Sequence, residues 1–187
     1  MSGNAGEGIH HRSMWHRLAA VLPLILALLL FIGFAGYQLD LPGLHYDEAR
    51  EAGLNAMQLL TGQPVTAFRD ATFPLGPWRI PLMVQDYIGN LTVLLATPFL
   101  AIGGINTVAL RALPVFLALL TLVLVWRIAL HLSGPLAAAA AAILLAANPS
   151  FVFWSRQGIF VTNITALLLV AALWFVVLWL QQRRPRD

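Results

Sequence analysis

Two adjacent carboxylates, Asp47 and Glu48, are the residues best suited to chemistry in this sequence. They open a segment in which small and apolar residues recur at helical spacing until Gly62, and Pro64 follows, as at the end of a helix. A carboxylate at such a position can act as a base toward a hydroxyl. Carboxylates in the first turn of a helix also stabilise it by about 0.3–1 kcal/mol through the helix dipole. The spacing therefore indicates either a catalytic pair or a helix cap.

The same helix predicts a polar face. Asp47, Glu51, Asn55 and Gln58 recur every three or four residues, so their side chains would point the same way. His45, beside the two carboxylates, could join them around a divalent metal ion, although three such ligands within one loop are also common by chance. The sequence contains no cysteine, which excludes thiolate metal sites and cysteine nucleophiles.

Two arginines are candidates for binding an anion. Arg79 lies in the segment 73–81, whose prolines predict a rigid loop, and it follows a tryptophan. Arg156 lies in the segment 153–158, which the predicted spans place on the same side of the membrane as Asp47. A fixed guanidinium can bind a phosphate through two parallel hydrogen bonds. Both segments are also typical of a membrane edge, where tryptophan and arginine gather.

The composition indicates an integral membrane protein. Of the 187 residues 59% are hydrophobic and 10% are charged, with a mean hydropathy of +0.79, whereas soluble domains have about 25% charged residues. These values exclude a disordered chain and an ordinary cytosolic enzyme, and the lack of cysteine excludes a disulfide-stapled secreted domain. The basic residues are all arginines scattered between apolar runs, so the net charge of +3 does not indicate nucleic-acid binding.

Several apolar segments are long enough to cross a bilayer, which needs about 20 residues of helix. The four predicted spans cover residues 18–39, 113–132, 135–154 and 164–180. A further uncharged segment, 87–102, would rise only about 24 Å as a helix, so we expect it to lie at the interface or to re-enter. Four crossings place the N-terminus in the cytoplasm and most arginines in short cytoplasmic flanks, as the positive-inside rule requires.

The predicted fold is therefore all-α, with about four membrane-spanning helices and a long outer first loop, 40–111, that contains interfacial helices. Six of the eight acidic residues lie in this loop. A connection of this length exceeds what joining two helices requires, and such loops usually carry function. We therefore expect any chemistry to take place there, outside the membrane.

Short motifs recur in a fixed order from residue 18 to residue 180. They are the segments 46–49, 59–62, 76–81, 103–104, 109–114, 148–149 and 155–158. In this order they resemble membrane glycosyltransferases of the GT-C type, above all the protein O-mannosyltransferase and lipid A aminoarabinose transferase group with its bacterial members. Such proteins have more than four spans, so the resemblance implies that the 187 residues are the N-terminal part of a longer transmembrane glycosyltransferase.

The resemblance implies a specific activity. These enzymes transfer a sugar from a polyprenyl-phosphate carrier to a hydroxyl of a protein, lipid or glycan at the outer face of the cytoplasmic membrane, in the cell envelope. Asp47 matches the acidic residue of the first loop, the expected base or organiser of the acceptor hydroxyl, with Glu48 beside it. Arg79 and Arg156 match positions expected near the donor phosphate. Whether a divalent metal ion takes part is left open.

Two other functions remain open. In a non-catalytic membrane subunit, Asp47 and Glu48 would merely cap a helix and bind a partner. Half of a transporter or flippase is disfavoured, because the middle of the predicted spans holds no ionisable residue of the kind that marks a transport pathway.

Overall fold

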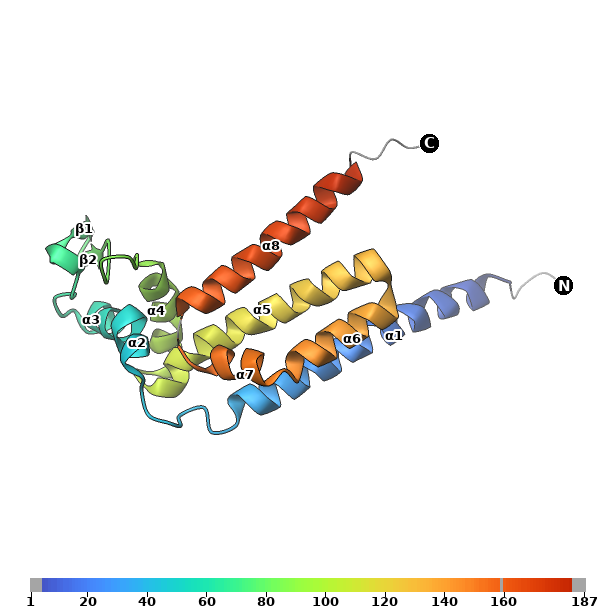
Figure 1. Ribbon diagram of the computed structural model, residues 1–187, viewed down its shortest axis with the longest axis horizontal. Helices are drawn as coiled ribbons and strands as arrows, with labels where there is room; N and C mark the ends of the chain where they lie inside the picture. Colours follow the sequence, from blue (N-terminus) through green and yellow to red (C-terminus); the bar gives the residue numbers. More distant parts are fainter. Residues whose placement is uncertain (1–4, 159, 183–187) are drawn as a thin grey trace.

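The computed structural model describes residues 5–158 and 160–182, with side chains for 21–158 and 161–182. The chain is mainly helical, as predicted, and divides into a long bundle and a smaller layer at one end of it (Figure 1). The bundle consists of α1 (Ala5–Gly36), α5 (Thr107–Ser133), α6 (Pro135–Ala146), α7 (Pro149–Arg156) and α8 (Phe160–Gln182). The layer consists of α2 (Tyr46–Glu48), the π-helical turn η1 (Ala49–Gly53), α3 (Leu54–Thr61), the 3-10 turn η2 (Phe68–Asp70), β1 (Thr72–Leu75), β2 (Trp78–Pro81) and α4 (Leu91–Gly103).

Within the described residues, two helices are long and apolar enough to cross a membrane, namely Thr107–Ser133 and Val161–Gln182. α6 and α7 together form a third candidate, bent by 57° between them. The described apolar part of α1, Val21–Gly36, is shorter than a full span. The structure is therefore that of an all-α membrane protein, and the count of four crossings stays a prediction. The terminal arginines 183, 184 and 186 on which it partly depends lie outside the described residues.

Turn residues set where the bundle helices begin and end. Gly134, with φ of 85°, separates α5 from α6, which starts with Pro135 at its first position. Asn148 caps α7 by accepting a hydrogen bond from the Phe151 N–H, and Pro149 prevents α6 from continuing. Asn106 caps α5 in the same way through the Ala109 N–H. α5 consequently starts six residues before the predicted span 113–132, and α1 ends three residues before the predicted 39.

Two apolar cores share α5. The first lies inside the bundle, where α1, α5 and α6 run side by side (Figure 1); its best buried members include Ala27, Phe31, Leu122 and Ala142. Small residues at these contacts let the helix backbones approach closely in lipid. The second core joins the first half of α5 to α3, α4 and the chain between β2 and α4, and includes Ala52, Ala56, Val84, Val93 and Leu113. α5 thus connects the bundle to the layer.

The predicted first-loop helix is confirmed over 46–61, where α2, η1 and α3 follow one another without a break. It ends at Gly62, whose φ of 70° is most favourable for glycine. The π-helical turn was not predicted: the N–H of Leu54 donates to the carbonyl of Ala49 five residues back, so the helix is locally widened.

The segment 73–81 is not the proline-braced loop that the sequence indicated. β1 and β2 pair in antiparallel register, with Leu75 opposite Trp78 and Phe73 opposite Ile80. Gly76, with φ of 58°, occupies the first position of the two-residue turn, where favoured hairpin turns require positive φ. The prolines suggested a loop because they cannot donate hydrogen bonds, but a two-stranded ribbon needs donors on only one edge of each strand.

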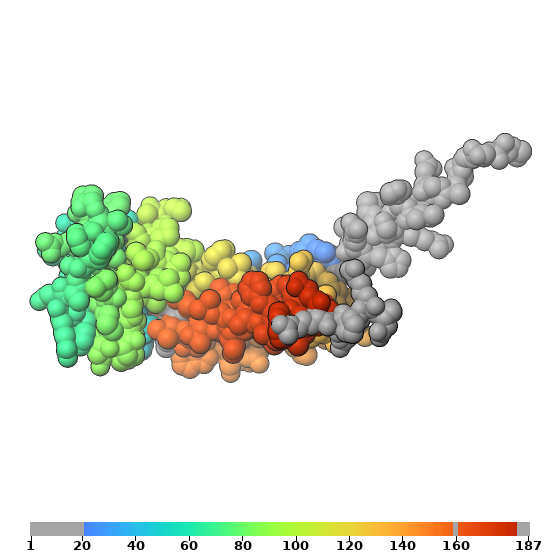
Figure 2. All heavy atoms as spheres, turned by 90° about the horizontal axis from the view of Figure 1, so that it is seen from above, coloured from blue at the N-terminus to red at the C-terminus, as the bar shows by residue number. Residues whose placement is uncertain are grey.

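The segment predicted to be interfacial or re-entrant forms α4, a helix of 13 residues that lies across the direction of α5 (Figure 1). At 1.5 Å per residue it is about 20 Å long, too short to cross a bilayer. Figure 2 shows how the residues of the first loop gather as a head at one end of the bundle.

Candidate functional site

Glu48 has a fully buried side chain where the layer meets the bundle. Its Oε1 accepts hydrogen bonds from Arg111 Nε at 2.9 Å and from the Gly158 N–H at 2.6 Å. Its Oε2 accepts from Arg111 Nη2 at 3.0 Å and from the His45 N–H at 3.0 Å. Both oxygens are therefore saturated by donors from three different segments. Two parallel bonds to one guanidinium are the strongest form of such a pair.

Arg111, 2% exposed on the first turns of α5, uses its other donors on the chain that leaves α1. Its Nη1 donates to the carbonyls of Leu39 at 2.7 Å and Pro42 at 3.0 Å, and its Nη2 donates to that of Gly43 at 3.0 Å. One guanidinium thereby fixes the connection 39–43 and the start of the first-loop helix. We call Glu48, Arg111 and these backbone groups the clamp.

The clamp keeps Glu48 ionised at neutral pH. Burial by itself would raise the pKa of this carboxyl group. The hydrogen bonds from Arg111, Gly158 and His45, together with the positive charge of Arg111, outweigh burial and hold the pKa below its ordinary value. A charged carboxylate with no accessible surface suits a positioning role rather than direct contact with a substrate.

Asp47, the neighbour of Glu48, keeps an accessible carboxylate; its side chain is 40% exposed. The Asp47 N–H donates to His45 Nδ1 at 3.2 Å, which makes His45 the N-cap of the helix. The same Nδ1 also lies 3.6 Å from Asp47 Oδ2. The Asp47 carboxylate is thus held on a fixed backbone with its oxygens open to solvent.

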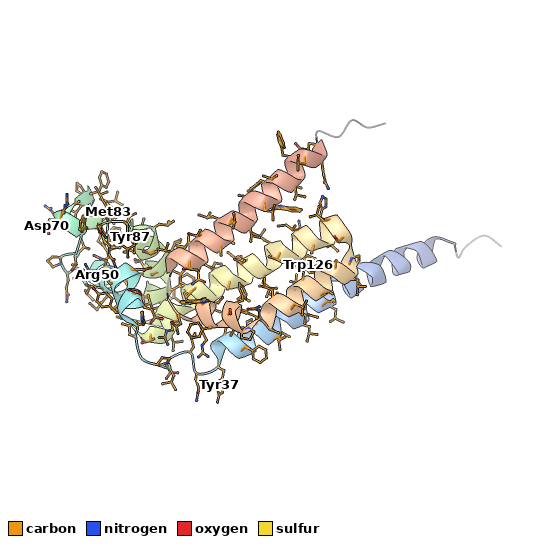
Figure 3. The ribbon with its side chains drawn as sticks, viewed as in Figure 1. Tyr37, Arg50, Asp70, Met83, Tyr87 and Trp126 are labelled. Carbon is orange, nitrogen blue, oxygen red and sulfur yellow. The ribbon has the colours of Figure 1, made fainter. Side chains whose placement is uncertain are left out.

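Arg50 is a cation that the sequence analysis did not single out. It lies one helical turn after Asp47, is exposed, and is held against Tyr46. Its Nη1 donates to the Tyr46 hydroxyl at 2.8 Å, and its guanidinium carbon lies 5.8 Å from the centre of that ring. Figure 3 places Arg50 in the layer, away from the shaft of the bundle. The signal in the sequence was its spacing of three from Asp47.

Arg156 lies near the clamp, because the chain just after it reaches Glu48. Gly158, two residues further on, is bonded to Glu48. The Arg156 guanidinium itself donates from Nη2 to the carbonyls of Tyr37 at 2.6 Å and Gln38 at 2.7 Å, the turn that ends α1. Tyr37 marks this turn in Figure 3. The structure therefore brings Arg156 and the segment of Asp47 to one corner of the molecule.

Arg79 lies elsewhere in the layer. It is exposed on β2 and borders a groove with Trp78 and with the end of α3 around Gln58. Gln58 follows Asp47 by eleven residues of helix, a rise of about 16 Å. The two arginines expected near one phosphate lie on different parts of the molecule, Arg156 on α7 of the bundle and Arg79 on β2 of the layer. The assignment of Arg79 to the donor stays a prediction.

The expected polar face does not face solvent as a whole. Glu51 and Asn55 are 6% and 1% exposed and lie on the side of the helix that packs toward α4, where Thr92 donates its hydroxyl to the Glu51 carbonyl at 2.6 Å. Asn55 Nδ2 donates to the carbonyl of Thr66 at 3.0 Å. Spacing alone does not indicate which side of a helix is covered, and here the covered side includes two of the predicted polar positions.

A metal site is not formed by the expected side chains. Among the described residues, no group of three histidine or acidic side chains is arranged to hold a metal ion. His45 Nδ1 is engaged by the Asp47 N–H, and both Glu48 oxygens are engaged by donors. These three side chains therefore do not converge on one point.

The clamp partner Arg111 was missed in the sequence analysis, although it lies in a motif that contributed to the resemblance. It is the one charged residue between Thr107 and Trp126 of an otherwise apolar helix. An ionisable residue in such a helix marks a functional or structural site with a partner. The partner, 63 residues earlier in the chain, could not be inferred from local spacing.

The fold and the site define an integral membrane protein with a polar, clamped loop at one end of its bundle. The family model of the dolichyl-phosphate-mannose-protein mannosyltransferases matches residues 91–187, slightly more than half of the chain. The chain belongs to this family of GT-C membrane glycosyltransferases, which confirms the resemblance. The matched region contains Arg111, Arg156 and Gly158, whereas Asp47 and Glu48 precede it. No curated protein and no solved structure gives a significant match.

Replacing Arg111 by methionine is expected to destabilise the protein by about 3–5 kcal/mol, because it leaves the buried Glu48 carboxylate without its charged partner. The measurement is thermal unfolding in detergent micelles. Arg127→Met is the matched control, since Arg127 is an exposed arginine on the same helix.

The double variant Glu48→Gln with Arg111→Met should recover part of the lost stability, because no buried charge then remains. Equal stability of Arg111→Met and the wild type would show that the pair does not act as a clamp.

Proposed function

We propose that this protein transfers a sugar from a polyprenyl-phosphate carrier to a hydroxyl acceptor on a protein, lipid or glycan at the outer face of the cytoplasmic membrane. The observation that carries the proposal is the clamp: two buried charges hold the start of the first-loop helix so that Asp47 keeps an accessible carboxylate. Family membership supports the reaction class. The donor, the acceptor and the membrane face are the proposed parts.

In the proposed reaction Asp47 is the base. Its carboxylate accepts the proton of the acceptor hydroxyl while the hydroxyl oxygen forms a bond to the anomeric carbon of the donor. The bond between that carbon and the phosphate oxygen breaks, and the polyprenyl phosphate leaves with the electron pair. Glu48 contacts neither reactant; it positions Asp47 through the backbone that the clamp holds.

The departing phosphate requires a positive partner, since stabilising developing charge is the largest catalytic contribution in many enzymes. Arg50 is the nearest candidate along the chain, one turn from Asp47 and exposed. Arg156 is the second, because its segment reaches the clamp while its guanidinium also holds the end of α1. Arg79, the third, lies beyond the end of α3.

The site's position suits a lipid-linked donor. The layer adjoins the C-terminal end of α1 and the N-terminal end of α5 (Figure 1). These ends are predicted to lie at the outer membrane surface, where a polyprenyl phosphate would place its charge while its tail stays in the bilayer. α4, short and apolar, packs against α5 at this level. A site at this boundary can receive one substrate from lipid and the other from water.

Asp47→Asn should lower the consumption of a labelled polyprenyl-phosphate sugar by about a hundredfold or more, since general base catalysis contributes about 10²–10⁴. The assay uses the full-length protein reconstituted in vesicles. Asp70→Asn is the control, because Asp70 is an exposed carboxylate of the same loop and its positive φ tolerates asparagine.

If Asp47→Asn inserts normally and is as active as the wild type, Asp47 only belongs to the first turn of the helix and takes no part in the reaction. If neither protein consumes any donor, the non-catalytic membrane subunit is favoured instead.

Arg50→Gln should lower kcat/KM for the donor at least tenfold, because a hydrogen bond to a charged group contributes about 1.5–3 kcal/mol. Arg69→Gln is the matched control: Arg69 is exposed in the same loop, with its guanidinium 5.1 Å from the Phe68 ring centre. Measuring Arg156→Gln and Arg79→Gln alongside ranks the three cations. An Arg50→Gln protein with unchanged donor kinetics would remove Arg50 from the phosphate site.

The orientation can be tested with single cysteines, because the chain contains none of its own. Asp70→Cys, in the first loop, should react with a membrane-impermeant maleimide applied to intact cells. Ser133→Cys, an exposed position at the turn between α5 and α6, should react only after the cells are opened. The reverse pattern would place the proposed site in the cytoplasm.

A further inference from the structure

A concave site lies in the layer, apart from Asp47. It is a groove of about 350 Å³ between the end of α3 and the tip of the β1–β2 hairpin. The residues that line it come from three segments: Gln58, Leu59, Gly62, Gln63, Pro64, Val65, Pro77, Trp78 and Arg79. Its volume lies at the lower end of the range for small-molecule sites, about 300–1,000 Å³.

The wall of the groove on the side of α3 is held rigidly. Gln58 Nε2 donates to Thr66 Oγ1 at 3.0 Å, and the Thr66 N–H donates back to Gln58 Oε1 at 2.9 Å. Asn55, itself buried, bonds the Thr66 carbonyl. These bonds fasten the chain after Gly62 onto the helix. A groove whose wall is fixed before binding loses little conformational entropy when a ligand enters.

The opposite wall offers a flat ring beside a cation. Trp78 is 53% exposed although it belongs to a paired strand. Arg79 is exposed, and its guanidinium makes no hydrogen bond or ion pair within the described part of the chain. The lining contains no acidic residue, and Gln63 adds an exposed amide. The groove therefore combines the apolar ring face of Trp78, the planar hydrogen-bond donors of the Arg79 guanidinium and the amide of Gln63.

We propose that this groove binds a sugar ring of the acceptor, as a subsite separate from the site of transfer. A pyranose has one face of C–H groups, which can stack on the Trp78 indole, and a rim of hydroxyl oxygens, which can accept hydrogen bonds from Arg79 and Gln63. The assignment of this sugar to an acceptor rests on the proposed function, whereas the binding of a sugar ring in the groove does not.

The position of the groove indicates an extended acceptor. The eleven residues of helix between Asp47 and Gln58 correspond to about 16 Å, so a ring in the groove is not the ring that reacts. An acceptor that carries several sugars in a row could occupy both places. Arg79 then contacts the acceptor rather than the carrier phosphate.

A peptide strand fits the hairpin less well. Pro74 on β1 and Pro81 on β2 lack an N–H, so neither strand offers a full set of donors for an added strand. Trp78 is also a residue typical of the membrane interface. The experiment is chosen so that these roles give different results.

Binding is measured by saturation-transfer NMR on the full chain in detergent micelles, with mannotriose and trigalacturonic acid as probes. Saturation should reach the ring C–H protons of at least one probe. Trp78→Ala should weaken the affinity for that probe about tenfold, because the apolar contact between the indole and the sugar ring is lost. Trp78→Phe should retain part of it, and Arg79→Gln should weaken it. A preference for the acidic probe would assign Arg79 to a carboxylate.

Phe73→Ala is the matched control. Phe73 lies on the same hairpin, is 54% exposed and does not line the groove, so this variant should bind like the wild type. No saturation of either probe would overturn the proposal. So would an equal loss in Phe73→Ala, or binding unchanged by Trp78→Ala, which would leave Trp78 as an interface residue.

Asp47→Asn separates this proposal from the proposed function. It should bind the probes like the wild type even though it cannot transfer a sugar. If the wild type consumes no donor but still binds a probe through Trp78, the groove stands as a sugar site and the proposed reaction fails. If donor turnover persists and probe binding is absent, the reaction stands and the subsite fails.

Discussion

The ion pair between Glu48 and Arg111 is the interaction on which the arrangement of the first loop depends. Removing two charges from water costs several kcal/mol per ion, and such a pair contributes only when its remaining donors and acceptors are satisfied. Here each oxygen of Glu48 has two donors, and Arg111 also donates to four carbonyls of the chain leaving α1, those of Leu39, Leu41, Pro42 and Gly43. The pair therefore specifies one geometry for Asp47 rather than adding stability alone.

α5 extends this constraint to the rest of the molecule. Its first turns carry Arg111 and the apolar contacts of the layer, and its later turns pack against α1 and α6. The loop is thus fixed to a helix that is itself fixed in the bundle. α8 differs, since most of its apolar surface is exposed and it diverges from α5 toward the C-terminus (Figure 1).

The sequence predicted those features that depend on local composition. Long apolar runs indicated the membrane helices, and periodic apolar residues before Gly62 indicated the helix 46–61. It did not predict which side of that helix is buried, because Glu51 and Asn55 are covered by α4, a segment far along the chain. It likewise identified Glu48 as a candidate but not Arg111 as its partner. Tertiary contacts, rather than residue type, separate the exposed Asp47 from the buried Glu48.

The distance along the chain between the clamp residues has a consequence for biosynthesis. Glu48 leaves the ribosome 63 residues before Arg111 and 110 residues before Gly158. Until α5 is inserted and the chain after α7 has followed it, this carboxylate has only the local His45 N–H as a donor, which does not compensate for the burial of its charge. The loop must therefore remain hydrated and open during insertion and close only afterwards. The first loop therefore closes only once the helices up to α7 are in place.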